Sequence, residues 1–176
     1  NVMSSFTNKN GTLITKRKNI LNKKIITGIS STRNDSKISL IGVKDKPGVA
    51  ASIFEPLSKN DINVDMVVQN ISSNSIDTDI TFTTKSNYVY KTLRLLKENK
   101  KIKFKKILVD NEVSKVSIIG VGMISTPGIT YRMFKSLSKK KINILVISTS
   151  EIKISVLINR RNTKKAVIAL HKEFKL

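Results

Sequence analysis

The chain has 176 residues, 39% of them hydrophobic and none of them Cys, which excludes disulfides and thiolate metal sites and leaves room for one ordinary domain or two small ones. Its 33 Lys and Arg residues against 12 Asp and Glu residues give a formal net charge of +21. No apolar run approaches the roughly 18 residues that span a bilayer, and the polar start of the chain lacks a signal peptide. We therefore expect a soluble protein in a reducing compartment such as the cytoplasm.

The positive charge by itself favours a nucleic-acid partner, because basic surfaces neutralise phosphates. However, Lys outnumbers Arg, whereas phosphate and base-edge contacts favour Arg. The basic residues are also spread over every segment instead of being gathered on one helix or tail. This pattern disfavours nucleic acid as a partner, and a basic nucleic-acid-binding βαββαβ module remains the alternative interpretation.

Two stretches of the chain repeat one another. The stretch KISLIGVKDKPGVAASIFEPLSKNDINVDMV, from Lys37, aligns with KVSIIGVGMISTPGITYRMFKSLSKKKINILVI, from Lys115. The second copy carries a two-residue insertion before its Pro-Gly pair, and the segments IGV, PG, LSK and IN occur in both copies. The chain is therefore predicted to be a tandem duplication.

In the first copy, hydrophobic periodicity predicts strands at residues 38–43, 63–69, 78–84 and 104–109, with a turn at 70–75. Two amphipathic helices separate these strands, and their apolar stripes are Ala50, Ile53, Phe54 and Leu57, and then Val89, Leu93 and Leu96. We expect Pro47 in the first turn of the first helix, where a missing N–H has no cost. The order βαββαβ places an antiparallel sheet under two helices.

The second copy predicts strands at residues 116–121, 144–149 and 152–157. Its two helices have apolar stripes formed by Thr130, Met133, Phe134 and Leu137, and by Ala166, Ala169, Leu170 and Phe174. This copy lacks a closing strand, which leaves a sheet edge open, and residues 24–32 are placed to fill that edge. The predicted fold is α+β, with two ferredoxin-like βαββαβ units, each an antiparallel sheet covered on one face by two helices, and the first inserted into the second.

The motifs of bond-forming chemistry do not occur in the sequence. GVGMISTPG, residues 120–128, lacks the third Gly of a dinucleotide-binding fingerprint, and no phosphate-loop motif occurs. His171 lies in a Lys-rich terminal segment without a nearby acid or nucleophile, which is typical of a surface histidine. No carboxylates show the spacing of a metal site. We expect no catalytic residue, cofactor or metal in this chain.

The turn in GVKDKPGVAASIF, residues 42–54, leads from a strand into a helix N-terminus, where unpaired N–H groups favour an anion. Asp45 lies in this turn, and Asn63, Asp65 and Gln69 follow on the next strand, so we place all four at one end of the unit. A carboxylate beside free N–H groups suits a zwitterion such as a free amino acid. The amino acid's carboxylate would accept hydrogen bonds from the N–H groups, and its ammonium would pair with Asp45 or Asp65. Alternatively, Asp45 caps the helix and Asn63 is a turn residue. Spacing leaves both interpretations open.

The run DKPGVAASIFEPLSKNDINVDMVVQNISS…TDITFT, followed by STPGITYRMFKSLSKKKINILVISTSEIKISVL and ALHKEF, closely resembles the regulatory region of bacterial aspartate kinase, a pair of ACT domains. The resemblance covers nearly all of residues 25–176, and VDMVVQN and ISTSEIKISVL are specific to that family. NVMSSF…GTLI resembles the end of the kinase domain, with Met3 where an Arg is usual, and the signature KFGGTS is missing. The expected division is a kinase-like tail at 1–23, a strand of the second ACT domain at 24–35, and ACT domains at 36–112 and 113–176.

The resemblance implies a part in feedback inhibition. Aspartate kinase phosphorylates the side-chain carboxylate of aspartate with ATP on the route to lysine, threonine and methionine, and end products inhibit it through the ACT pair. ATP and Mg would then belong to the kinase domain that this chain lacks. The implied partners are an effector, threonine and/or lysine, a second ACT unit through self-association, and a catalytic domain or subunit, but no membrane. The chain would be a regulatory fragment or a separate regulatory subunit.

The resemblance also assigns effector-binding residues. Carried over position by position, they are Asp45, Ala50, Asn63, Val64, Asp65 and Gln69 in the first unit, and Ile129, Thr130, Asn143, Ile144, Ser150 and Glu151 in the second. Ser72 falls where the family tunes inhibitor sensitivity. Because Leu145 stands where the first unit has Asp65, we do not expect the two pockets to be equivalent.

Overall fold

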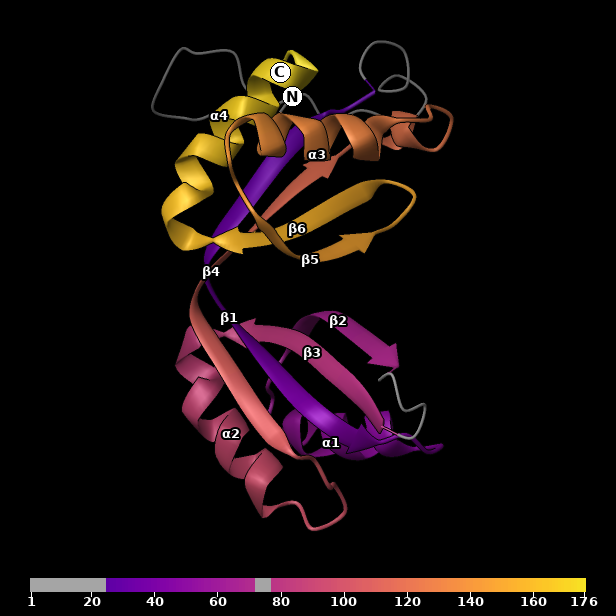
Figure 1. Cartoon of the computed structure of the whole chain (residues 1–176), viewed down its shortest axis with the longest axis vertical. Coiled ribbons are helices and arrows are strands. Elements are labelled where there is room, and N and C mark those ends of the chain that lie inside the picture. Colours follow the sequence, from indigo (N-terminus) through magenta and orange to yellow (C-terminus); the bar gives the residue numbers. More distant parts are fainter. Residues whose placement is uncertain (1–24, 72–76) are drawn as a thin grey trace, which may run out of the picture.

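The computed structural model describes residues 25–71 and 77–176 (Figure 1). The strands in this part of the chain are β1 (Gly28–Lys44), β2 (Val64–Ile71), β3 (Asp77–Lys85), β4 (Lys106–Ile119), β5 (Ile144–Thr149) and β6 (Lys153–Asn159). The α-helices are α1 (Val49–Ser58), α2 (Val89–Glu98), α3 (Ile129–Lys139) and α4 (Thr163–Phe174). Short 3-10 turns, η2 (Ser86–Tyr88), η3 (Val121–Met123) and η4 (Arg160–Asn162), precede α2, α3 and α4. None of the helices described is long and apolar enough to cross a membrane.

Two long strands, β1 and β4, run through both halves of a six-stranded antiparallel sheet of order β2-β3-β1-β4-β6-β5 (Figure 1). The start of β1, Gly28–Thr32, pairs with Lys115–Ile119 of β4. The rest of β1 pairs with β3 on one side and with Lys106–Asp110 of β4 on the other. We refer to the described residues between 35 and 110 as unit 1, and to residues 25–32 with 113–176 as unit 2.

The α+β fold with two βαββαβ repeats is as predicted, and the strand that completes unit 2 comes from before unit 1. This strand begins at Gly28, not at residue 24. The expected breaks between 24–32 and 38–43, and between 104–109 and 116–121, are wrong, because each pair forms one strand. Residues 110–115, DNEVSK, contain no Gly or Pro that would end a strand. The exact domain boundaries stay a prediction, and the tail at 1–23 lies outside the described residues.

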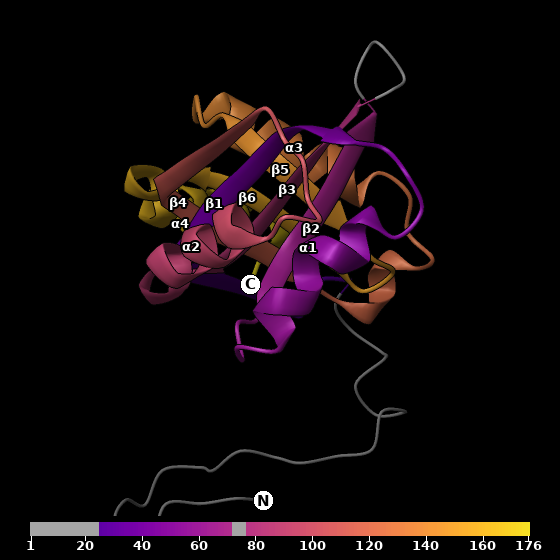
Figure 2. The same ribbon diagram turned by 90° about the horizontal axis from the view of Figure 1, so that it is seen from below.

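Each unit buries one face of its sheet beneath two helices. Phe82 and Ile53 are fully buried in unit 1, where the rings of Phe54 and Phe82 meet edge to face at 5.3 Å. Met133 and Leu170 are fully buried in unit 2. The helices lie on the outer sides of the molecule, so that the two uncovered sheet faces look toward each other (Figures 1 and 2).

A small apolar cluster joins these inner faces. Met66 of β2 packs there with Val113 and Leu157, and the partly buried Val146 of β5 lies against them. Met66 is 5% exposed and has a φ of 48°, a left-handed conformation that is uncommon for a non-glycine residue. The contact between the units is therefore built around one strained residue of the edge strand β2.

In α1 and α3 the apolar stripe begins one residue earlier than predicted, while Ile53, Leu57, Met133 and Leu137 are buried as predicted. Gly48, at a φ of 85°, caps α1, so that Pro47 lies before the cap and not in the first turn. Val49 is buried in the first turn while Ala50 is only half-buried. In α3, likewise, Ile129 is buried and the predicted Thr130 is exposed. The left-handed glycine turns the first helical residue, rather than the second, toward the core.

The stripe of α2 also differs from the prediction, whereas that of α4 agrees with it. Leu96 is buried in α2, but Thr92 is the second buried residue, and Val89 and Leu93 are only half-buried. In α4, Ala166, Ala169 and Leu170 of the predicted stripe are buried, and Phe174 is partly buried against the core.

Candidate functional site

The N-terminus of α1 lacks a side-chain cap. Gly48 occupies the cap position and provides no side-chain cap. The Val49 N–H donates to the Lys46 carbonyl at 3.1 Å. The next N–H groups of the first turn, those of Ala50 and Ala51, remain available to a ligand. Asp45 is exposed in the preceding turn, and no hydrogen bond or ion pair joins it to any described residue. The interpretation of Asp45 as a helix cap is therefore wrong. A free carboxylate and free N–H groups lie in the same short turn.

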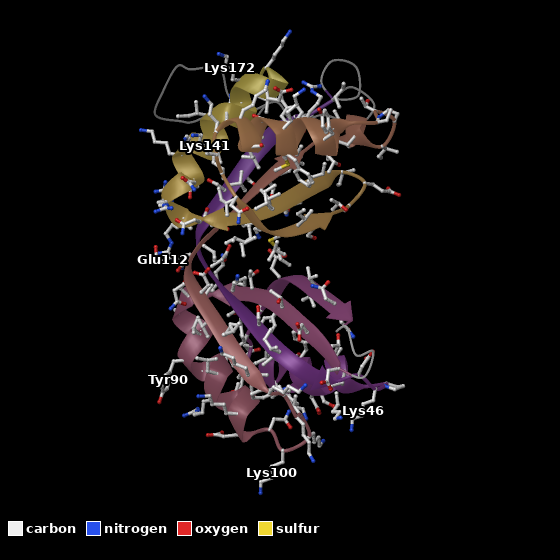
Figure 3. The ribbon with its side chains drawn as sticks, viewed as in Figure 1. Lys46, Tyr90, Lys100, Glu112, Lys141 and Lys172 are labelled. Carbon is white, nitrogen blue, oxygen red and sulfur yellow. The ribbon has the colours of Figure 1, made fainter. Side chains whose placement is uncertain are left out.

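Cationic side chains surround this helix N-terminus. A pocket of about 490 Å3 beside the turn is lined by Lys44, Lys46, Pro47, Gly48, Val49, Ser52, Lys100, Lys101 and Lys103. Lys46 and Lys100 mark this outer end of unit 1 in Figure 3. The lysines and the positive end of the helix dipole favour an anionic group in the pocket. These lysines are not among the predicted site residues, although the run KENKKIKFKK, residues 97–106, indicates a cationic surface.

The predicted effector residues of unit 1 fall at two ends of the sheet, not at one. Thr78 of β3 pairs with Val43 and with Ile71, so the β1–α1 turn lies beside the end of β2. Asp65 pairs with Thr83 of β3. Thr83 lies roughly 17 Å along β3 from Thr78, because a strand rises about 3.3 Å per residue. Asp45, Ala50 and Gln69 therefore belong to one end, and Asn63, Val64 and Asp65 to the other. The prediction failed because α1 returns the chain to the far end before β2 begins, so that β2 runs parallel to β1.

Asp65 contacts unit 2. Lys115 Nζ of β4 donates to Asp65 Oδ2, and the Met66 N–H donates to Asp65 Oδ1 at 2.8 Å. Partial burial is the largest single influence on the pKa of Asp65 and raises it. The hydrogen bonds from Lys115 and Met66, with the charges of Lys115 and Lys153, outweigh burial and hold this pKa below its ordinary value. Asp65 thus joins the two units, a contact that no local sequence pattern reveals.

The predicted residues of unit 2 divide in the same way. Ile129 is buried and Thr130 exposed at the start of α3, and Ser150 and Glu151 are exposed in the β5–β6 turn. The Gly120 N–H donates to the Ile152 carbonyl at 2.9 Å, which brings that turn to the end of β4 from which α3 departs. At the opposite end, a pocket of about 460 Å3 is lined by Phe134, Ser138, Lys141, Ile142, Asn143 and Ile144.

Three remaining residues bear on the sequence-based interpretations. Ser72 lies outside the described residues. His171 is exposed on α4, as expected of a surface histidine. Phe82, the one aromatic residue in the described strands, is fully buried, whereas RNA-binding sheets of this topology stack bases on exposed aromatic side chains. The sheet therefore offers no stacking platform within the described part of the chain.

The repeat, the fold and the paired turns agree with one known family. The ACT domain family matches residues 38–99 and 116–174, one match in each unit. The chain belongs to the ACT domain family. The aspartate kinase of Pseudomonas fluorescens (strain SBW25) is 44% identical over 177 residues, which cover 99% of this chain and 43% of that relative. The ACT pair thus spans less than half the length of the aspartate kinases that it matches.

Two solved structures show which part of an aspartate kinase this ACT pair resembles. A crystal structure of aspartokinase alpha and beta subunits contains a chain that is 40% identical, with a TM-score of 0.78, and the match covers 86% of this chain and 99% of that one. The ligand-free regulatory subunit of aspartate kinase from Thermus thermophilus is 34% identical, with a TM-score of 0.79 and the same coverage. The ACT pair is a regulatory region of the aspartate kinase type, which confirms the resemblance seen in the sequence.

Proposed function

We propose that this ACT pair senses a free amino acid, threonine and/or lysine, and passes the signal to a kinase domain or subunit that phosphorylates aspartate with ATP. The match to the regulatory part of aspartate kinases supports the role. The observation that carries the choice of ligand is the uncapped start of α1 beside Asp45, which has no partner among the described residues. This turn offers complementary groups to both charges of a zwitterion.

The ligand's α-carboxylate binds the N–H groups of the first turn of α1, and the surrounding lysines favour its negative charge. Its α-ammonium pairs with Asp45. Asp65 is a weaker candidate for that role, because Lys115 already binds it and it lies at the other end of β2. Each effector site thus begins as a half-site at one end of a unit.

A second copy of the chain completes these half-sites. The strands β2 and β5 are the two edges of the sheet, and both expose apolar side chains, Val67 at 49% and Ile147 at 44%. Antiparallel pairing of β2 with β5 of another copy would bring Gln69, at the end of β2, beside Asn143 and Ile144, at the start of β5. The same pairing would bring Asn63, Val64 and Asp65 beside the other copy's Ile129, Thr130, Ser150 and Glu151. Effector binding and dimerisation would then be coupled, because the ligand contacts both chains.

Calorimetric titration of the chain with threonine and with lysine, separately and together, tests this function, and light scattering measures the molecular mass in each case. We expect one of the two amino acids to bind a dimer, or to shift a monomer toward the dimer. If neither amino acid binds at millimolar concentration, the sensor function is wrong. If an amino acid binds a species that stays monomeric, the completion of the site by a second copy is wrong.

A further inference from the structure

A second pocket lies between the inner faces of the two units, away from the helix N-termini. This inter-unit pocket has a volume of about 310 Å3 and is lined by Lys37, Ser39, Val68, Asn70, Thr81, Ile144, Leu145, Val146 and Ile147. Of the residues assigned to effector binding, Ile144 alone lines it. Pockets that bind small molecules begin at about 300 Å3, so this one has room for a ligand of a few carbon atoms.

Lys37 is the only charged residue that lines the inter-unit pocket. Its side chain is 23% exposed, and its nearest carboxylate oxygen, Asp110 Oδ2, lies 4.0 Å from Nζ, beyond hydrogen-bond distance. No acceptor within hydrogen-bond distance of this ammonium is found among the described residues. Lys37 is partly buried and its ion pair with Asp110 is at 4.0 Å, so a bound carboxylate would give this ammonium a hydrogen-bonded partner that the described residues do not supply.

The other residues that line the pocket indicate which chemical groups the anion has besides its charge. Ser39 Oγ and Thr81 Oγ1 are 2.8 Å apart on the unit 1 wall, and with the Asn70 amide they offer donors to a second oxygen of the same ligand. The opposite wall is β5, where residues 144–147 are Ile, Leu, Val and Ile. No Asp or Glu lines the pocket, so it lacks a carboxylate for an α-ammonium.

We propose that the inter-unit pocket binds a small aliphatic carboxylate without a neighbouring ammonium, with its carboxylate on Lys37 and its hydrocarbon part against β5. Because the two walls belong to different units, this ligand stabilises the arrangement in which the inner faces are close. The site is separate from the amino-acid site at α1 and does not depend on it.

The test uses the full chain with 13C-labelled methyl groups and the probe 4-methylpentanoate. Binding is read from the NMR signals of Val68 and Val146, which line this pocket and neither the pocket beside α1 nor the one beside Asn143. We expect saturable shifts of these signals with 4-methylpentanoate, and at least about tenfold weaker binding of the uncharged 4-methylpentanamide. Leucine, which adds an ammonium to the same hydrocarbon skeleton, should also bind more weakly than the acid.

Two lysine variants test how much the charge of Lys37 contributes to binding of the acid. Lys37→Met should weaken binding of the acid about tenfold to a hundredfold and leave that of the amide unchanged. Lys106→Met is the control, because Lys106 is an exposed lysine on β4, the neighbouring strand, and lines neither this pocket nor the pocket beside α1. Melting temperatures check that both variants fold, and Val68→Phe, which fills the pocket, should abolish binding without removing Lys37.

Three results would overturn the proposal: equal affinity for the acid and the amide, unchanged binding of the acid by folded Lys37→Met, or an absence of saturable shifts in wild type. A loss of binding in Lys106→Met equal to that in Lys37→Met would also contradict it, because general surface charge would then explain the affinity.

Discussion

In unit 1 the helix α1 follows Gly48 at a φ of 85°, and in unit 2 the helix α3 follows Gly128 at 86°. Both helices also end alike, with left-handed residues in the turn that follows, Asp61 at 56° and Lys141 at 55°. Two copies that differ at most surface positions thus retain the same backbone turns at both ends of their first helix. The backbone geometry at the start and the end of this helix is common to both units.

The charges placed on that geometry differ. Asp45 has no acidic counterpart in the turn before α3, where GMISTP replaces KDKP and a 3-10 turn takes up the extra length. Leu145 stands where unit 1 has Asp65. Both copies therefore retain a first helix that starts after an uncapped left-handed glycine, but only unit 1 has a carboxylate in the turn directly before that helix. Five experiments test this difference between the units.

The largest effect on stability is expected from removal of the N-terminal strand segment that completes the sheet of unit 2. Deleting residues 1–32 removes the strand Gly28–Thr32, and with it the buried Ile26, from unit 2 but leaves all strands of unit 1. We expect a lower melting temperature and loss of hydrogen-exchange protection in β5 and β6, while β2 and β3 keep theirs. Deleting residues 1–24 alone is the control. Equal protection of both units in the two deletions would show that unit 2 does not need this strand.

A glycine shared by the repeats is needed for different reasons in the two units. At Gly120, an added Cβ would lie 2.1 Å from the Ile25 carbonyl oxygen, a backbone atom. At Gly42, which has a φ of 66°, it would meet the movable side chain of Lys105. Gly120→Ala should lower the free energy of unfolding by about 3 kcal/mol or more, and Gly42→Ala by about 1–2 kcal/mol. Denaturant titration measures both, and the reverse order would contradict the assigned packing.

The helices α1 and α3 differ at Pro56 and its counterpart Ser136. Pro56 has no N–H for the Ser52 carbonyl, which instead accepts from the Asn99 side-chain amide at 2.9 Å. Asn99→Ala should therefore cost about 1 kcal/mol of unfolding free energy. Ser136→Ala removes only a long hydrogen bond, 3.3 Å, to the Ala169 carbonyl and should cost about 0.5 kcal/mol or less. Equal costs in chemical denaturation would mean that Asn99 does not replace the missing donor.

The smallest effect concerns Asp65 and pH. Its pKa is lowered in the folded chain, so its contribution to stability is fully present above the unfolded value of 3.8 and is lost as pH falls through the folded value. Because the side chain is 57% exposed, screening limits this contribution to about 0.5 kcal/mol. As pH falls from 5 to the value at which the chain unfolds, the free energy of unfolding should therefore decrease slightly more in wild type than in Asp65→Asn. Parallel pH profiles would show that the contact with Lys115 is not stabilising.

The element pattern was largely predictable from the sequence, because it depends on local periodicity. The strand Ile144–Thr149 lies where its alternation predicted it, and the closing strand of unit 2 followed from a count of the strands in each repeat. The merging of strands into β1 and β4 was not predictable, because periodicity does not tell which partner the next residue pairs with. The Asp65–Lys115 contact and the inter-unit pocket are equally hidden, since both depend on how the two sheets face each other.

The most direct test of the central claim is the affinity of Asp45→Asn for the amino acid that binds wild type. Asp61→Asn is the matched control, since it removes the same charge from another exposed turn, and Asn tolerates its left-handed φ of 56°. Calorimetry should show affinity reduced about tenfold to a hundredfold in Asp45→Asn, with Asp61→Asn like wild type and all three melting temperatures alike. Unchanged affinity in Asp45→Asn would contradict the account, because the ligand's ammonium would then lie elsewhere.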